Sequence, residues 1–178
     1  MFSTLETKAG LGGRSIIPNS ENTFAVYAPS RQGGVGLLFL LKGTETMNAD
    51  EQAIAAVLAK YQDALNQSDT NAVMNLYASD GVFMPQHFPS SVGAAAVRKA
   101  YDAVFDAITL SVKFEVAEIK QVAPDWAIAR TNSAGIVKVN AMGQSGPEAN
   151  QELFAYQKIG AVWGIARYCF STTNPPRA

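Results

Sequence analysis

The sequence has a single cysteine, Cys169, and a single histidine, His87, among its 178 residues. One cysteine cannot form an intramolecular disulfide, which agrees with a reducing compartment. One histidine excludes a metal centre built from several histidines, and no other spacing of metal-binding side chains occurs. The glycine-rich stretches AGLGGR and RQGGVG neither follow a strand nor open a helix, so they are not dinucleotide-binding loops. We therefore expect no metal and no cofactor.

Charged residues are also scarce, at 16 % of the chain, and they nearly balance to a formal net charge of −1. Because Lys and Arg form no cluster, neither nucleic acid nor an anionic membrane is an expected partner. The longest strongly apolar run, VGLLFLL at residues 35–41, is far too short to span a bilayer and lies too deep in the chain for a signal peptide. With no targeting signal, we expect a cytoplasmic location.

The residues that are present divide the chain near residue 47. Residues 1–46 hold seven of the fourteen glycines, show no helical period and contain one candidate strand, at residues 36–42. From Met47 onward the apolar pattern is strong, and a helix start signal follows this methionine directly. We interpret residues 47–178 as the domain. Residues 1–46 then have three possible interpretations: sequence upstream of a natural start at Met47, an arm that docks on a partner, or an added leader. We prefer the first.

Three helices are predicted in the first half of the domain. Asn48 and Glu51 form a capping-box pair, and apolar residues at helical spacing continue to Leu65. Asp69 can cap a second helix, which we expect to run past Tyr77 and to end at the turn formers Asp80-Gly81. Apolar residues at helical spacing predict a third helix over residues 97–108.

After residue 110 the apolar period changes to two, which is typical of strands. Strands are predicted at residues 112–122, 126–139, 151–159 and 162–172, with a loop at 140–150 and a hairpin turn at Gly160-Ala161. Helices followed by strands indicate an α+β domain with an antiparallel sheet and helices on one face.

Three stretches resemble the NTF2-like superfamily, and within it the SnoaL-like proteins and the DUF4440 or SgcJ/EcaC-type group: YQDALNQSDTNAVMNLYASDGVFMP, VGAAAVRKAYDAVF and ANQELFAYQKIGAVWGIARYCFSTTNP. The resemblance implies a cone, in which a curved antiparallel sheet wraps around the N-terminal helices and encloses a pocket. It also implies a homodimer. The superfamily includes ketosteroid isomerase and polyketide cyclases as well as binding and assembly modules, so the fold does not decide the function.

The same resemblance places Met84, ahead of Pro85, where ketosteroid isomerase has its catalytic base. A thioether cannot accept a proton from carbon, so the known steroid mechanism is not expected. Tyr61 matches the tyrosine that holds the enolate oxygen in that enzyme, a worked case of tuned acid–base chemistry. It would donate a hydrogen bond to a ligand oxygen, or it is a core tyrosine whose hydroxyl finds a backbone partner.

Glu152 shares a strand face with Asn150, Phe154 and Tyr156. If this face lines the cone, burial would raise the pKa of Glu152 and suit it to proton transfer. The alternative, which we prefer slightly, is a structural ion pair with Arg130 or Arg167.

His87 could act as a general acid or base near the pocket mouth. The alternative, which we prefer, is an exposed loop histidine.

Two functional hypotheses stay open, and the sequence does not decide whether the protein is an enzyme. In the first, a pocket binds a small, largely apolar molecule for isomerase, cyclase or dehydratase chemistry with Glu152, Tyr61 and His87. In the second, the domain is a non-catalytic homodimeric binding or assembly module. The side chains expected to line a pocket are Tyr77, Met84, Tyr101, Phe105, Asn150, Phe154 and Tyr168.

Overall fold

The computed structural model describes residues 16–18, 23–26, 39–42 and 47–175 of the chain. The chain divides into two units, residues 1–46 and residues 47–178. The first unit contains a three-stranded antiparallel sheet in the order β1 (Ile16–Pro18), β2 (Thr23–Val26) and β3 (Phe39–Lys42). β3 lies within the strand predicted at 36–42, the rest of which lies outside the described residues. β1 and β2 were not predicted, because strands this short contain too few residues to show an alternation of apolar and polar side chains.

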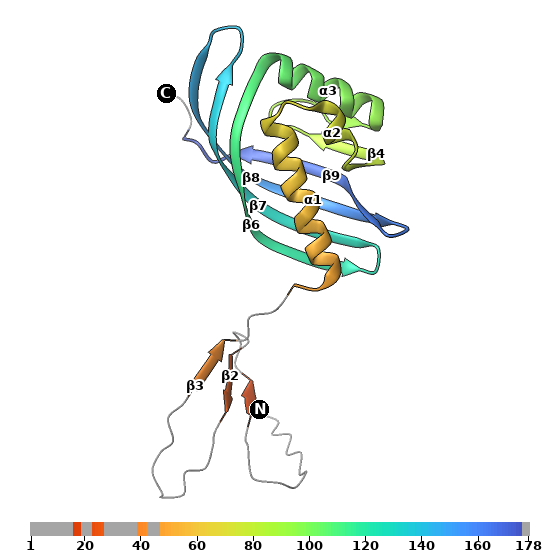
Figure 1. Ribbon diagram of the computed structural model, residues 1–178, viewed down its shortest axis with the longest axis vertical. Helices are drawn as coiled ribbons and strands as arrows, with labels where there is room; N and C mark the ends of the chain where they lie inside the picture. Colours follow the sequence, from red (N-terminus) through yellow and green to blue (C-terminus); the bar gives the residue numbers. More distant parts are fainter. Residues whose placement is uncertain (1–15, 19–22, 27–38, 43–46, 176–178) are drawn as a thin grey trace, which may run out of the picture. The chain divides into compact units, whose positions relative to one another are not determined.

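The second unit is an α+β domain, and its elements are seen in Figure 1. Its three helices are α1 (Ala49–Asn66), α2 (Thr70–Met74) and α3 (Ala94–Ala107). Its sheet has the order β5-β4-β9-β8-β7-β6, with the bounds β4 Tyr77–Met84, β5 Ser91–Val92, β6 Ile108–Ala123, β7 Trp126–Val139, β8 Gln144–Ile159 and β9 Val162–Thr172.

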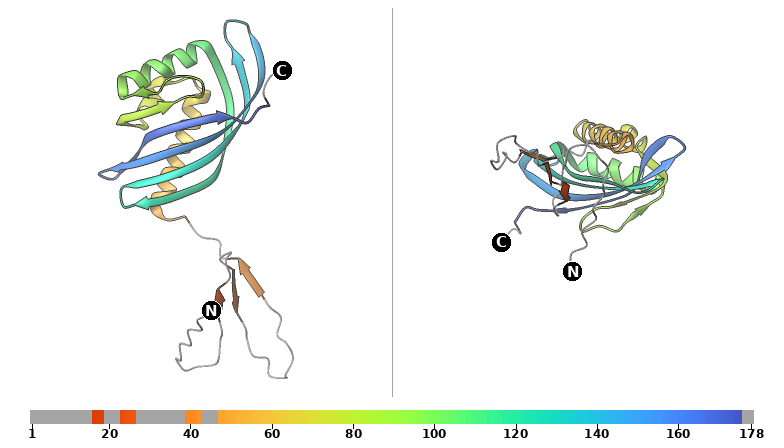
Figure 2. Two further views of the ribbon diagram at one scale, coloured as in Figure 1. Left: turned by 180° about the vertical axis from the view of Figure 1, so that it is seen from behind. Right: turned by 90° about the horizontal axis from the view of Figure 1, so that it is seen from below.

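The sheet of this unit is strongly curved, and α1 lies across its concave side (Figures 1 and 2). This confirms the predicted α+β class and the curved sheet wrapped around N-terminal helices. One detail differs, because β4 and β9 run parallel and the sheet is therefore mixed. None of the helices in the described part of the chain combines the length and the apolar character needed to cross a bilayer.

Helix α1 begins as predicted. The Asn48 side chain accepts a hydrogen bond from the Glu51 backbone N–H, and the Glu51 carboxylate accepts one from the Asn48 backbone N–H, each at 2.9 Å. The face of α1 turned to the sheet buries Ile54, Leu58 and Tyr61. Tyr61 thereby reaches the middle of the domain.

The stretch after α2 differs from the prediction. Asp69 does cap α2, but the helix ends at Met74, and residues 77–84 form β4. Pairing with β9 prevails over the local helical pattern: Tyr77 pairs with Ile165, and the Ile165 N–H donates to Leu76 O. Asp80-Gly81 does not end a helix but lies at an irregularity within the strand. Glycine is required at Gly81, because a Cβ there would lie 2.6 Å from Tyr77 Cδ1.

All four predicted strands are present, as β6 to β9, and β6 and β8 are longer than predicted. β7 and β9 have the predicted bounds, and Gly160 makes the hairpin turn with a φ of +64°. The loop predicted at 140–150 is wrong, because β8 already begins at Gln144 and pairs with β7 throughout. The first residues of β8 are polar and include Gly146 and Pro147, which are uncommon in strands, so the sequence pattern does not predict a strand there.

β9 contains a bulge that alters which side chains face the core. Ile165 pairs with Tyr156 and Arg167 pairs with Ala155, so Ala166 has no partner on β8. Strict alternation along β9 would place Ile165 and Arg167 on one face. Instead Ile165 points inward, Arg167 outward and Tyr168 inward, where Tyr168 is 5 % exposed.

Candidate functional site

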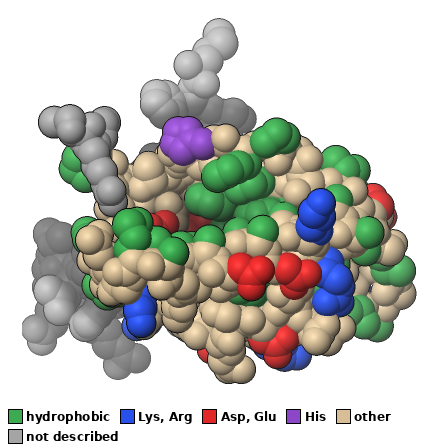
Figure 3. Space-filling model, turned by 90° about the horizontal axis from the view of Figure 1, so that it is seen from above, with side chains coloured by type: hydrophobic (Ala, Val, Ile, Leu, Met, Phe, Trp, Pro, Cys, Tyr) green, Lys and Arg blue, Asp and Glu red, His purple; other side chains and the backbone are tan. Residues whose placement is uncertain are grey.

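The concave side of the domain holds a cavity of about 640 Å³. Seen from above, the surface shows a hollow lined by hydrophobic side chains, with acidic atoms within it (Figure 3). The aromatic side chains that line the cavity come from α1, α3, β4, β6, β9 and the segment after β4, and they are Tyr61, Tyr101, Phe83, Phe114, Tyr168, Phe170 and Phe88. Its size and apolar walls are those of a small-molecule site.

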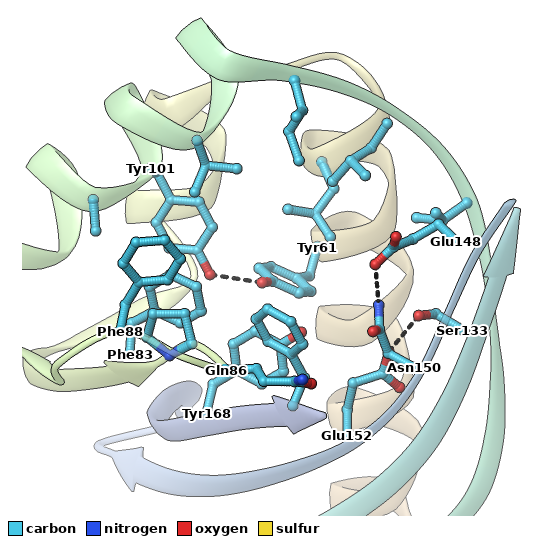
Figure 4. A pocket seen from close by; sticks show the side chains of 18 of the residues that line it. Tyr61, Phe83, Gln86, Phe88, Tyr101, Ser133, Glu148, Asn150, Glu152 and Tyr168 are labelled. Atoms are coloured by element: carbon cyan, nitrogen blue, oxygen red, sulfur yellow. Dashed lines mark hydrogen bonds between the residues drawn. The ribbon is translucent and has the colours of Figure 1, made fainter. Parts of the chain in front are cut away.

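Glu152 is the most buried acidic side chain of this cavity. It lies on the inner face of β8, opposite Thr131 of β7, and is 5 % exposed. The Thr131 hydroxyl donates to one carboxyl oxygen at 2.5 Å. The Ser133 hydroxyl donates to the other carboxyl oxygen (Figure 4). Its partners are therefore neutral hydroxyls.

The ion pair considered for Glu152 does not form. Arg130 binds Glu118 at 2.8 Å, and Arg167 lies 3.5 Å from Asp80. Both arginines leave the inner face, Arg130 by strand alternation and Arg167 by the bulge.

The environment of Glu152 raises the pKa of its carboxyl group above the ordinary value. Burial raises the pKa of the Glu152 carboxyl, the hydrogen bonds from Ser133 and Thr131 oppose this, and the charge of Glu148 raises the pKa further. In the described part of the chain no cation pairs with this carboxyl. A carboxyl group with a raised pKa beside an apolar cavity is a stronger base than an exposed carboxylate, which suits it to proton transfer.

Three tyrosine hydroxyls form a chain beneath the cavity. Tyr101 lies in the middle, 2.6 Å from the Tyr61 hydroxyl oxygen and 3.0 Å from that of Tyr77. Burial raises the pKa of each of the three, so all stay protonated. Two of the three O–H groups donate the two hydrogen bonds within the chain. The third O–H group is therefore free to donate a hydrogen bond elsewhere. Because Tyr61 and Tyr101 line the cavity, a ligand oxygen there can accept it.

Tyr168 lies on the cavity wall between aromatic neighbours. Its ring stacks on Phe154, with centroids 4.2 Å apart, and on Phe83, with centroids 5.6 Å apart. Burial raises the pKa of the Tyr168 hydroxyl, and the negative charge of Glu152 adds to this.

Comparison with known proteins agrees with this geometry. The sequence profile of the SnoaL-like domain matches residues 58–157. The chain belongs to this family. A ketosteroid isomerase-like protein from Erwinia carotovora atroseptica SCRI1043 is 34 % identical over 72 % of this chain and 100 % of its own, with a TM-score of 0.70. The suspected NTF2-like membership is thus confirmed. No curated protein matches the chain.

Two more distant structures share only the fold of this SnoaL-like protein. A hexachlorocyclohexane dehydrochlorinase, LinA type 2, is 12 % identical over 73 % of this chain and 90 % of its own, with a TM-score of 0.64. A putative calcium/calmodulin dependent protein kinase II association domain from Xanthomonas campestris is 17 % identical over 71 % of this chain and 89 % of its own, with a TM-score of 0.58.

The SnoaL-like domain brings some of the predicted site residues together. Glu152, Tyr61, Tyr101, Asn150 and Tyr168 all line the cavity.

Three residues predicted to line the pocket lie around it instead. Tyr77, Phe105 and Phe154 belong to the surrounding core, where Tyr77 binds the Tyr101 hydroxyl.

Met84 and His87 lie apart from the cavity lining. Met84 is next to Phe83, which faces the cavity, and strand alternation turns Met84 to the other side, beside Cys169. His87 is exposed, with a φ of +67°, and its ring Nε2 lies 2.7 Å from Gln86 Nε2. Its neighbours Gln86 and Phe88 line the cavity.

The pattern reading missed Ser133, Thr131 and Glu148. Thr131 and Ser133 become visible only once β7 is set in register with β8, because Thr131 lies opposite Glu152 and Ser133 opposite Asn150. Glu148 was missed because it lies in the part of β8 that was predicted to be a loop. Within the described residues, no group of three or more His, Cys, Asp or Glu side chains is arranged to hold a metal ion.

Proposed function

We propose that this SnoaL-like domain binds a small, largely apolar molecule in its cavity and transfers a proton with Glu152, in a reaction of the isomerase, cyclase or dehydratase type. The observation that carries the proposal is the Glu152 carboxyl, which is 5 % exposed, bound only by two hydroxyls among the described residues, and located on the wall of an apolar cavity. The printed name of the Erwinia relative, ketosteroid isomerase-like, supports this class.

In this proposal each polar group has a role that fits its position. Glu152 removes a proton from a carbon next to a ligand carbonyl and returns it at the same or another position. The carbonyl oxygen becomes negative as the proton leaves. It accepts a hydrogen bond from the O–H group that is not used within the chain of Tyr61, Tyr101 and Tyr77. Apolar walls exclude water and strengthen both interactions. His87, being exposed, could serve only a ligand at the mouth of the cavity.

Enolisation of an apolar ketone is the smallest reaction that tests this proposal. 2-Tetralone is incubated with the protein in D2O, and deuterium uptake next to its carbonyl is followed by mass spectrometry. We expect uptake above the buffer rate, and Glu152→Gln should lower the protein-dependent rate by about 10²-fold or more while the ketone still binds. Glu115→Gln, an exposed carboxylate on β6, is the matched control and should keep full activity. Uptake that is unaffected by Glu152→Gln, or no uptake with the wild type, contradicts the proposal.

A second candidate function is a non-catalytic homodimeric binding or assembly module. Leu153 on β8 favours it, because this side chain lies on the opposite face from Glu152 and is 45 % exposed in the middle of the sheet. Contact with a second copy through this face would remove the apolar side chain from water. Sedimentation velocity of the wild type and of Leu153→Arg distinguishes the cases: a dimer that Leu153→Arg separates into monomers supports this surface, and an unchanged mass argues against it. The expected cytoplasmic location remains a prediction.

A further inference from the structure

The side chains that β8 turns into the cavity present hydrogen-bond acceptors. These are Glu148, Asn150 and Glu152, referred to here as the β8 wall, which Figure 4 shows on one side of the cavity. Among the described residues, Glu148 and Glu152 are also the only charged side chains that line the cavity. The charge on this wall is therefore of one sign.

The hydrogen bond between Asn150 and Glu148 fixes which way the Asn150 amide points. Asn150 Nδ2 lies 2.8 Å from Glu148 Oε1 and donates to it, since a carboxylate oxygen can only accept. Asn150 Oδ1 must therefore point away from Glu148. This oxygen is buried and accepts no hydrogen bond from the described part of the chain. A buried acceptor without a partner is costly unless a bound molecule supplies a donor.

The hydroxyl donors next to Glu152 are already used. The hydroxyls of Ser133 and Thr131 both donate to Glu152. Gln86, the other amide that lines the cavity, accepts from the Thr172 N–H and lies 2.7 Å from the His87 ring nitrogen. The β8 wall thus offers a ligand lone pairs on Asn150 Oδ1 and on the two carboxyl groups, and these acceptors outnumber its one remaining donor, the second N–H of the Asn150 amide.

We propose that the ligand of this cavity is an organic cation: a largely apolar molecule with a protonated amine, whose N–H groups donate to Glu148, Asn150 Oδ1 and Glu152. An ammonium group has three donors and a positive charge, which matches three acceptor side chains of which two are acidic. The aromatic rings of the lining, such as Tyr168 and Phe170, add favourable contacts to a cation and to its apolar body. A carboxylate or phosphate in the same place would be repelled. This inference rests on the proposed small-molecule pocket and names its ligand class.

A matched series of probes with the same three-ring body tests the ligand class with the full chain. The probes are 9-(aminomethyl)anthracene, 9-anthracenemethanol and 9-anthracenecarboxylic acid, and binding is followed by fluorescence titration. We expect the amine to bind about tenfold more tightly than the alcohol, the usual effect of a hydrogen bond to a charged group, and the acid to bind most weakly. Glu148→Gln and Asn150→Leu should each remove most of the advantage of the amine and leave the alcohol unchanged. Glu115→Gln is the control and should bind all three as the wild type does.

The outcomes separate this inference from the proposal on which it rests. Preference for the amine that Glu148→Gln or Asn150→Leu abolishes supports the cationic ligand. Equal binding of all three probes, or tightest binding of the acid, overturns the cationic ligand while the apolar pocket stands. Preference for the amine that both variants retain also overturns it, because the amine is then held elsewhere. Failure of all three probes to bind overturns both the ligand class and the small-molecule pocket.

Discussion

The chain of tyrosine hydroxyls makes a prediction about stability that depends on the order of its members. Tyr61 and Tyr77 are at the ends and each makes one hydrogen bond, so replacing either by phenylalanine should lower the free energy of unfolding by about 0.5–1.5 kcal/mol. Tyr101 makes both bonds. Tyr101→Phe removes two bonds and leaves the Tyr77 hydroxyl buried without its partner, so its cost should reach about 2–4 kcal/mol.

Tyr156 provides the control for the same chemical change. Its ring is fully buried, and its hydroxyl has no hydrogen-bond partner in the described part of the chain. Removing a buried hydroxyl that is unpaired relieves a desolvation penalty, so Tyr156→Phe should be neutral or should stabilise by about 1 kcal/mol.

Urea unfolding of the four variants, followed by tryptophan fluorescence and circular dichroism, measures these differences. The expected order of destabilisation is Tyr101→Phe first, then the two end variants, then Tyr156→Phe. The double variant Tyr61→Phe with Tyr77→Phe should cost less than Tyr101→Phe, because it leaves only the Tyr101 hydroxyl unpaired and that hydroxyl lines the cavity. If Tyr101→Phe is no more harmful than Tyr77→Phe, the hydroxyls do not act as a chain.

Three further predictions concern backbone packing and ionisation. Gly135→Ala should lower the free energy of unfolding by about 3 kcal/mol or more, because the new Cβ would lie 2.0 Å from Ser111 O. The control is Gly146→Ala, whose Cβ meets nothing within 4 Å, and its free energy of unfolding should stay within about 0.5 kcal/mol of wild type in thermal unfolding. Asp50 accepts from Lys158 Nζ at 2.6 Å and Trp163 Nε1 at 2.9 Å, which lowers the pKa of its carboxyl. The contribution of the Asp50 carboxylate to stability is present above the unfolded pKa of about 4 and is lost as pH falls through the lower folded pKa. Asp50→Asn should therefore lower Tm at pH 7, and the difference in Tm from wild type should shrink in acid. The control Asp63→Asn should change Tm little. For Glu152 the folded pKa is raised, so its contribution is full below the unfolded pKa and is lost as pH rises through the folded pKa. Glu152→Gln should therefore gain stability relative to wild type as pH rises above the unfolded pKa of about 4, by about 1.4 kcal/mol for each unit by which the folded pKa is raised. A difference in stability that does not vary with pH would contradict a raised pKa.

The elements that depend on local signals could be predicted from the sequence. The start of α1 follows from the pairing of Asn48 with Glu51, and the β8–β9 hairpin follows from two alternating runs around Gly160. β4 could not be predicted in this way, since its residues have a helical pattern and become a strand only because β9, more than 80 residues later in the chain, pairs with them. Tertiary pairing outweighs such local preferences, which amount to a few tenths of a kcal/mol per residue.

The candidate site was half predictable for a related reason. Alternation on β8 correctly groups Glu152 with Phe154 and Tyr156, all of which are buried. Alternation cannot tell which residue of β7 lies opposite Glu152, because this is set by the register of two strands joined by a turn whose length the sequence does not reveal.

A single residue of register decides the chemistry of Glu152. Thr131 lies opposite Glu152, and Arg130, one position earlier, lies opposite Leu153 on the other face. A shift of one residue would exchange the two, so that Glu152 would be held as a charged carboxylate in an ion pair. On β9 the bulge at Ala166 has the same effect, because it turns Arg167 away from the cavity and toward Asp80. Two arginines close to Glu152 in the sheet are thus directed outward, and the carboxyl group faces the cavity with a raised pKa and with hydroxyls as its only partners among the described residues.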